Sequence, residues 1–173
     1  MNRHLGPWLA GLLLACSTAQ ADTGTVSASG FTVTHTRPVK ATQKQLFEAF
    51  GRIGQWWNPQ HSYSGQGANL SLDLAAGGCF CERWDGGSVQ HMQVVHVAKD
   101  TMVRLVGGLG PLQELPVQGV LTMEAATVDG RTVLKLSYRV AGPPDIGLEK
   151  WAGPVDKVLG EQVNRLVAYV ERP

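Results

Sequence analysis

Hydrophobic positions recur every three or four residues near the C-terminus and predict one long helix over 154–171. Gly153 suits the N-cap and Pro154 the first helical position, so we expect the helix to begin there. Its apolar stripe is formed by Val155, Leu159, Val163, Leu166 and Val170. Gln162 lies near the middle of this stripe. Such a helix must lay its apolar side on another element.

Earlier in the chain, from residue 68 to 142, polar and apolar residues alternate and no helical period appears. A first strand is expected at 31–36, then a helix capped by Thr42 and a second short helix over 52–57. Short turns between successive strands, such as Asp129-Gly130, indicate an antiparallel sheet. The predicted class is α+β: six to seven antiparallel strands wrapped around the long helix, with two short helices after the first strand.

The order of these elements resembles the helix-grip fold of the START-like superfamily, also called SRPBCC. The likeness covers 31–171 and includes the paired Trp56-Trp57, Gly77-Gly78 before the segment 79–82, and the amphipathic C-terminal helix. Within the superfamily the chain is most similar to homologues of the activator of the heat-shock-protein-ninety ATPase. The resemblance implies a cavity between sheet and helix that binds apolar molecules, and in a minority of members catalyses cyclisation or hydrolysis.

The first 21 residues have the features of a signal peptide. Arg3 precedes an apolar run, and Ala19-Gln20-Ala21 matches a cleavage site, so we expect cleavage after Ala21 and export to the periplasm or beyond. The alternative is a membrane-anchored lipoprotein, because the residues before Cys16 resemble a lipobox. Residues 22–30 are small and polar and are expected to form a flexible tether to a domain at 31–173.

Charge and composition narrow the range of partners. The net charge is +1 over 173 residues, and no basic block appears, which argues against nucleic acid as a partner. The apolar run of the signal peptide is too short to span a bilayer, so no transmembrane helix is expected. Nothing in the sequence indicates a cofactor.

The segment around Cys79 and Cys81 carries most of the candidate chemistry. Residues two apart on a strand lie about 6.6 Å apart with parallel side chains, so we expect two free thiols. If Trp84 pairs with Ser88 across the following turn, Cys81 lies opposite His91 as a nucleophile–base pair.

The segment offers two further kinds of chemistry. In the same register Glu82 faces Gln90 on the other side, and a carboxyl group there is a candidate general acid or base. His91 and His96 would face opposite ways, so we predict no metal site.

Aromatic residues with a few polar groups are the natural lining of a cavity for an apolar ligand. The candidate binding residues are Trp56, Trp57, Trp84, Tyr138, Trp151 and Gln162. The glycine-rich segment 107–116 is a candidate gate over the cavity.

The function expected is an exported binding module for a small, largely apolar molecule. The alternative is an enzyme of the same fold, of the cyclase or hydrolase type, that uses Cys81, His91 or Glu82. A third possibility is a protein whose own side chains fill the cavity. The sequence does not decide whether the protein is an enzyme.

Overall fold

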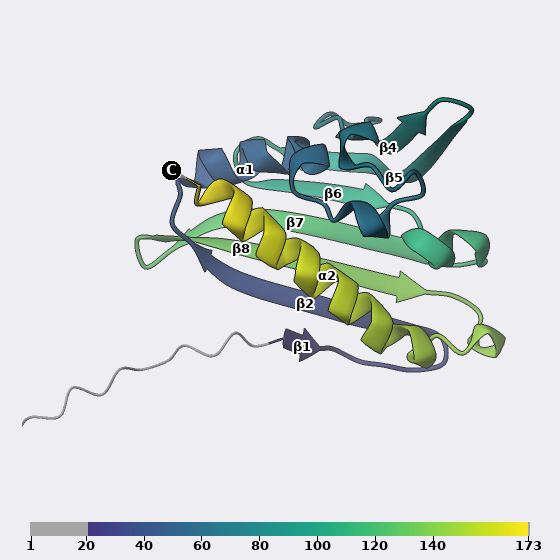
Figure 1. Ribbon diagram of the computed structural model, residues 1–173. Coiled ribbons are helices and arrows are strands. Elements are labelled where there is room, and N and C mark those ends of the chain that lie inside the picture. The colour runs from purple at the N-terminus through teal and green to yellow at the C-terminus, as the bar shows by residue number, and fades with distance from the viewer. Residues whose placement is uncertain (1–20, 173) are drawn as a thin grey trace, which may run out of the picture.

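The computed structural model describes residues 21–172 and forms one antiparallel sheet with a long helix lying across it (Figure 1). The strand order is β1-β2-β8-β7-β6-β5-β4-β3. The strands are β1 (Ala21–Thr23), β2 (Gly30–Val39), β3 (Leu70–Leu72), β4 (Cys79–Trp84), β5 (Gly87–Ala98), β6 (Met102–Val106), β7 (Gln118–Val128) and β8 (Arg131–Ala141). The predicted α+β class is confirmed, with β1 as one strand more than expected.

The helices after the first long strand follow the local signals in the sequence. Thr42 caps α1 (Gln43–Gly51) in a capping box with Gln45, and α1 buries Leu46 and Phe50. Four short 3-10 helices lie between α1 and β7: η1 (Ile53–Gln55), η2 (Pro59–His61), η3 (Gly67–Asn69) and, after β6, η4 (Gly110–Glu114). A fifth, η5 (Pro144–Ile146), precedes the long helix.

The long helix α2 (Glu149–Val170) begins before the predicted start, and Pro154 lies inside it. The prediction that Pro154 begins the helix is wrong. A proline in a helix interior removes a backbone hydrogen bond and costs about 3 kcal/mol. The first turn of α2 offsets the cost of Pro154, because it buries Leu148 and Ala152 and packs Trp151 against the core. Tertiary packing therefore outweighs the local start signal.

Helix α2 approaches β2 closely because Gly160 has no side chain. A Cβ atom at Gly160 would lie 2.9 Å from Cε1 of the buried His35. The imidazole Nε2 of His35 lies 3.0 Å from the Asp156 carboxylate and 3.2 Å from the Asp156 carbonyl oxygen. This polar contact beneath the helix fixes where α2 crosses the sheet.

The segment expected to be a tether is part of the fold. β1 pairs with β2, and the Gly24 amide donates to the Thr32 carbonyl. The Leu148 amide, at the start of α2, donates to the carbonyl of Ala28 at 2.9 Å. The expected tether at 22–30 is therefore corrected to an edge segment of the sheet, because its backbone finds partners on β2 and before α2.

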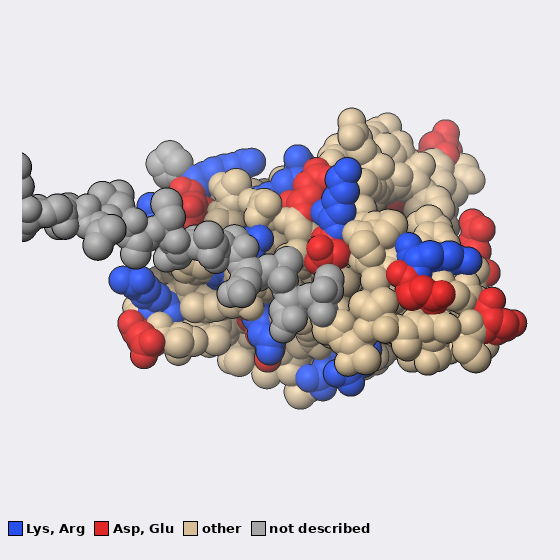
Figure 2. All heavy atoms as spheres, turned by 90° about the horizontal axis from the view of Figure 1, so that it is seen from below, with Lys and Arg blue, Asp and Glu red and all other residues tan. Residues whose placement is uncertain are grey.

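The expected signal peptide at 1–21 lies almost entirely outside the described residues, and Cys16 lies outside them as well. Within residues 21–172, no helix has the length and apolar character needed to cross a membrane. On the side shown in Figure 2, acidic and basic side chains form small separate groups with no broad basic patch.

Candidate functional site

A cavity of about 480 Å³ lies between the first half of α2 and the loops that face it. One wall comes from Trp57 and residues 60–63, and others come from α2 and from His91 on β5. The last wall comes from residues 107–116, which we call the cavity loop. The apolar part of the lining is Trp57, Leu109, Pro111, Leu112, Trp151, Pro154, Val155, Val158 and Leu159. The polar part is Gln60, His61, Ser62, Tyr63, His91 and Glu114. The cavity is thus mainly apolar, with polar groups on η2 and the loop after it, on β5 and on the cavity loop.

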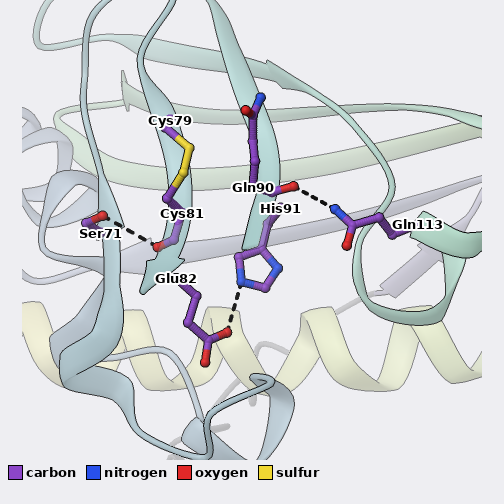
Figure 3. Close-up of a disulfide and its surroundings, with 7 residues drawn as sticks. All are labelled: Ser71, Cys79, Cys81, Glu82, Gln90, His91 and Gln113. Carbon is purple, nitrogen blue, oxygen red and sulfur yellow. Dashed lines mark hydrogen bonds and ion pairs between the residues drawn. A yellow bond between two sulfur atoms is a disulfide. The ribbon is translucent and has the colours of Figure 1, made fainter. Parts of the chain in front are cut away.

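Two of the predicted chemical residues, Glu82 and His91, form a buried pair at this cavity (Figure 3). The imidazole Nε2 of His91 lies 3.1 Å from the Glu82 carboxylate. The carboxylate also accepts hydrogen bonds from the backbone amides of Tyr63 and Ser64. The His91 ring packs on Phe80, with 4.7 Å between the ring centroids. His91 lines the cavity, whereas Glu82 stands behind it.

The surroundings set the protonation states of this pair. Burial is the largest influence on Glu82 and favours the neutral acid, but hydrogen bonds from Ser64, Tyr63 and His91 outweigh it and lower the pKa of Glu82. Burial also dominates at His91 and lowers its pKa, and Glu82 offsets only part of this effect. At neutral pH the pair is therefore an ionised carboxylate with a neutral imidazole. Nε2–H donates to Glu82, which leaves Nδ1 as a hydrogen-bond acceptor and proton acceptor.

His91 faces the cavity because β5 contains a bulge. Phe80 pairs with Met92 but Cys81 pairs with Gln90, so His91 is an extra residue without a partner on β4. His91 and the next residue, Met92, are both buried although Gln90 and Gln93 on either side are exposed, which a regular strand with one exposed face would not show. The predicted pairing of Cys81 with His91 is therefore wrong.

The turn of the same hairpin also differs from the prediction. Trp84 pairs with Gly87 instead of Ser88, which shifts the register by one residue up to the bulge. Gln90 is exposed and lies opposite Cys81, so it does not share the face of Glu82. A bulge has no period in the sequence, and its position was not predictable from alternation.

The two cysteines are joined in a disulfide, which corrects the expectation of free thiols (Figure 3). Their Cα atoms lie 5.3 Å apart, within the usual range for disulfides, and the register shift between β4 and β5 falls in the same segment. While this bond is intact, Cys81 has no thiolate and cannot act as a nucleophile. Among residues 21–172, no cluster of three or more His, Cys, Asp or Glu side chains could hold a metal ion.

Tyr138 has a different role from the one predicted. Its side chain is buried, and its hydroxyl donates to the Gly107 carbonyl and accepts from the Leu109 amide, both at 3.1 Å. A Cβ atom at Gly119 would collide with this hydroxyl, so glycine is needed there. Tyr138 does not line the cavity but holds the base of the cavity loop.

The remaining binding candidates divide between the cavity and the core. Trp57 and Trp151 line the cavity. Trp56 is buried, and its indole N–H donates to the Ala49 carbonyl, so it supports α1. Trp84 lies on the β4–β5 hairpin over Gly87, away from the cavity. Gln162 is fully buried, and its Oε1 accepts from the Asn58 amide at 2.7 Å.

Sequence reasoning missed the polar rim formed by the loop before β3. His61 lies 3.2 Å from the Glu161 carboxylate, which also accepts from the Asn58 side chain. These contacts tie η2 to α2 at the cavity edge. The only signal in the sequence was the high polarity of the loop, which does not specify a partner 100 residues away.

Comparisons with known proteins identify the fold alone. No family model matches the chain, and no curated protein matches it. Among solved structures, a conserved protein of unknown function from Enterococcus faecalis has a TM-score of 0.60 and 12% identity, covering 89% of this chain and 78% of that chain. A protein from Mesorhizobium loti has a TM-score of 0.60 and 18% identity, and the match covers 82% of this chain and 97% of that chain. A protein of unknown function from Staphylococcus aureus has a TM-score of 0.59 and 13% identity, and the match covers 82% of this chain and 94% of that chain.

Proposed function

We propose that this protein is an exported member of the START-like superfamily that binds a small, largely apolar molecule in the cavity between α2 and the cavity loop. The observation that supports this most is the cavity itself, whose volume of about 480 Å³ lies in the usual range for ligand pockets. Its walls are mainly apolar and carry a few polar groups. A protein that filled its interior with its own side chains would leave no such space.

The polar groups indicate how such a ligand is oriented. Trp57 and Trp151 offer aromatic surface to an apolar body. Nδ1 of neutral His91 accepts a hydrogen bond, so a hydroxyl or N–H group of the ligand suits that wall better than a carboxylate or phosphate. We therefore favour a neutral, largely apolar ligand with one hydrogen-bond donor. Membership of the group similar to the heat-shock-protein-ninety ATPase activator is part of the proposal, without a co-chaperone role, because that chaperone is cytoplasmic.

Native mass spectrometry of the protein isolated from the periplasm tests this proposal. We expect a co-purifying small molecule, and a mass of the whole polypeptide that corresponds to cleavage after Ala21. A lipidated Cys16 would instead identify a membrane-anchored lipoprotein.

A matched pair of variants assigns the binding to the cavity. Val155→Trp places an indole in the cavity, whereas Lys157→Trp places one on the exposed side of the same helix. The first variant should lose the ligand and the second should keep it. Equal ligand content in both would place binding elsewhere.

A second function, hydrolysis, is favoured by one specific observation, the Glu82–His91 pair in the cavity wall. Glu82 orients the imidazole, and Nδ1 can take a proton from a water molecule that attacks a bound ester. Turnover of neutral aryl esters such as p-nitrophenyl butyrate tests this. If His91→Gln abolishes turnover while the ester still binds, the protein is an enzyme; if neither protein accelerates hydrolysis, the binding function stands alone.

A further inference from the structure

We propose that the Cys79–Cys81 disulfide positions His91 in the cavity, and that its reduction shifts the β4–β5 hairpin into a second register that withdraws His91. The effect on ligand binding rests on the function proposed above, but the register shift itself does not. The proposal is based on the bulge, the disulfide opposite it and the two glycines of the turn.

The bulge and the disulfide lie at the same point of the hairpin. The register shift falls between Phe80 and Cys81, within the segment that the disulfide closes. A bulge lengthens β5 relative to β4 and bends the pair, with β4 on the shorter, inner side. The disulfide holds the two Cα atoms 5.3 Å apart, compared with about 6.6 Å in an extended strand. A shortened β4 therefore favours the bent, bulged pairing.

The same residues can also pair in a second register that has no bulge. The pairs Cys79–Gln93 and Phe80–Met92 lie on the far side of the bulge from the turn. If their register continued without a break, Cys81 would pair with His91 and Glu82 with Gln90. His91 would then share the outer face with Cys81, and the amide of Gln90 would stand beside the Glu82 carboxylate as a replacement donor.

The turn can accommodate both registers. In the observed form Trp84 pairs with Gly87, which leaves Asp85 and Gly86 as a two-residue loop. In the second form Trp84 would pair with Ser88, and Gly87 would join the loop. Gly86 has a positive φ of 82°, and a second glycine beside it gives the longer loop the same freedom.

The register change would reach the cavity at a second point. In the observed form the Gln90 carbonyl accepts a hydrogen bond from the Gln113 side chain on η4 (Figure 3). Gly107, where the cavity loop begins, lies against the bulge, and a Cβ atom there would be 2.7 Å from the His91 carbonyl oxygen. Moving residues 87–91 by one position removes both contacts. Reduction should therefore loosen the cavity loop as well as withdraw His91.

The reductant is a dithiol, either dithiothreitol or a dithiol oxidoreductase of the compartment. Its thiolate attacks one sulfur of the disulfide, and its second thiol resolves the mixed disulfide. The S–S bond of the protein breaks and two S–H bonds form. Two electrons and two protons leave the dithiol, which becomes a disulfide. Cys79 is the more accessible of the two cysteines, because it is partly exposed and Cys81 is buried.

Nuclear Overhauser contacts across the hairpin test the register directly. The oxidised protein should show Cys81 beside Gln90, and the dithiothreitol-reduced protein should show Cys81 beside His91. The Cys79→Ser/Cys81→Ser double variant should match the reduced protein and no longer respond to dithiothreitol. Unchanged Cys81–Gln90 contacts after complete reduction would overturn the proposal, and so would loss of the whole fold, because the disulfide would then be a general stabiliser.

Binding of the neutral fluorescent probe N-phenyl-1-naphthylamine tests the consequence for the cavity. We expect affinity to fall by about tenfold or more on reduction, the scale of losing one buried polar contact. His91→Ala should show a smaller redox dependence than the wild-type protein, because only the loosening of the cavity loop then remains. Undiminished affinity of the reduced wild-type protein would overturn the link to the cavity. If no probe binds in either state, the proposed function fails, and the cross-strand contacts still decide the register.

Discussion

Gln162 on α2 accepts a hydrogen bond from the backbone amide of Asn58 at 2.7 Å, and no part of its side chain is exposed. This contact joins the helix to the segment that follows Trp57 at the cavity. Gln162 is not among the lining residues, so it supports the cavity wall and does not contact a ligand. A buried backbone donor thus accounts for Oε1 of this polar residue in the apolar stripe, whereas its buried Nε2 has no hydrogen-bond partner among the described residues.

We expect Gln162→Leu to destabilise the protein by about 1–3 kcal/mol, because the Asn58 amide would remain buried without an acceptor. Urea unfolding at neutral pH measures this. Asn164→Leu, on the exposed side of the same helix, is the control and should change stability by less than about 0.5 kcal/mol. A stabilised Gln162→Leu variant would contradict the assigned role.

Trp151→Ala should lower the affinity for N-phenyl-1-naphthylamine by about tenfold or more, because an aromatic wall of the cavity is lost. Trp84→Ala is the matched control, since Trp84 is also half-buried but lies outside the cavity. A fluorescence titration of both variants separates a cavity effect from the general loss of a tryptophan. Equal losses in the two variants would contradict binding in this cavity.

Tyr138→Phe should destabilise the protein by about 1–2 kcal/mol and speed amide exchange at Leu109, because the cavity loop loses both contacts to the hydroxyl. Urea unfolding and hydrogen exchange give the two values. For strand residues far from the loop, the change in amide exchange should correspond only to the change in the global free energy of unfolding. If Leu109 is not selectively affected, the hydroxyl does not hold the loop.

Burial raises the pKa of Tyr138 to about 12, and this predicts an alkaline transition. The folded state binds the phenolic proton more tightly than the unfolded state does. The corresponding stability is present below the unfolded pKa of about 10 and is lost as the pH rises towards 12. Unfolding midpoints measured between pH 9 and 12 should fall steeply in the wild-type protein and less steeply in Tyr138→Phe.

Acid should destabilise the protein through the Glu82–His91 pair. The pKa of His91 is lowered by burial, so stability is lost as the pH falls below the unfolded value of about 6.5. The pKa of Glu82 is also lowered, so a further loss begins near its unfolded value of about 4.3. His91→Gln should flatten the first part of this profile.

The control for this pH profile is His96→Gln, which removes an exposed histidine from the same strand. Urea midpoints from pH 7.5 to 4 compare the two variants with the wild-type protein. If His96→Gln flattens the profile as much as His91→Gln does, the buried pair is not its source.

The sequence by itself determined the elements whose signals are local. Alternation predicted the strands, Thr42 predicted the start of α1, and the apolar stripe predicted that α2 lies on a sheet. These are properties of neighbouring residues, so they can be recognised without a partner. The nature of the cavity lining was also partly predictable, since Trp57 and Trp151 do line it.

Only the tertiary structure decided which groups meet at the cavity. An unsignalled bulge turned His91 towards Glu82 and away from Cys81, and the two cysteines on the neighbouring strand form a disulfide in place of the expected thiols. A single extra residue inverts which face of a strand each side chain occupies, so a small error in register changes the chemistry. The partners of Gln162 and Tyr138 likewise come from distant segments, and their roles as supports became clear only once those segments were placed.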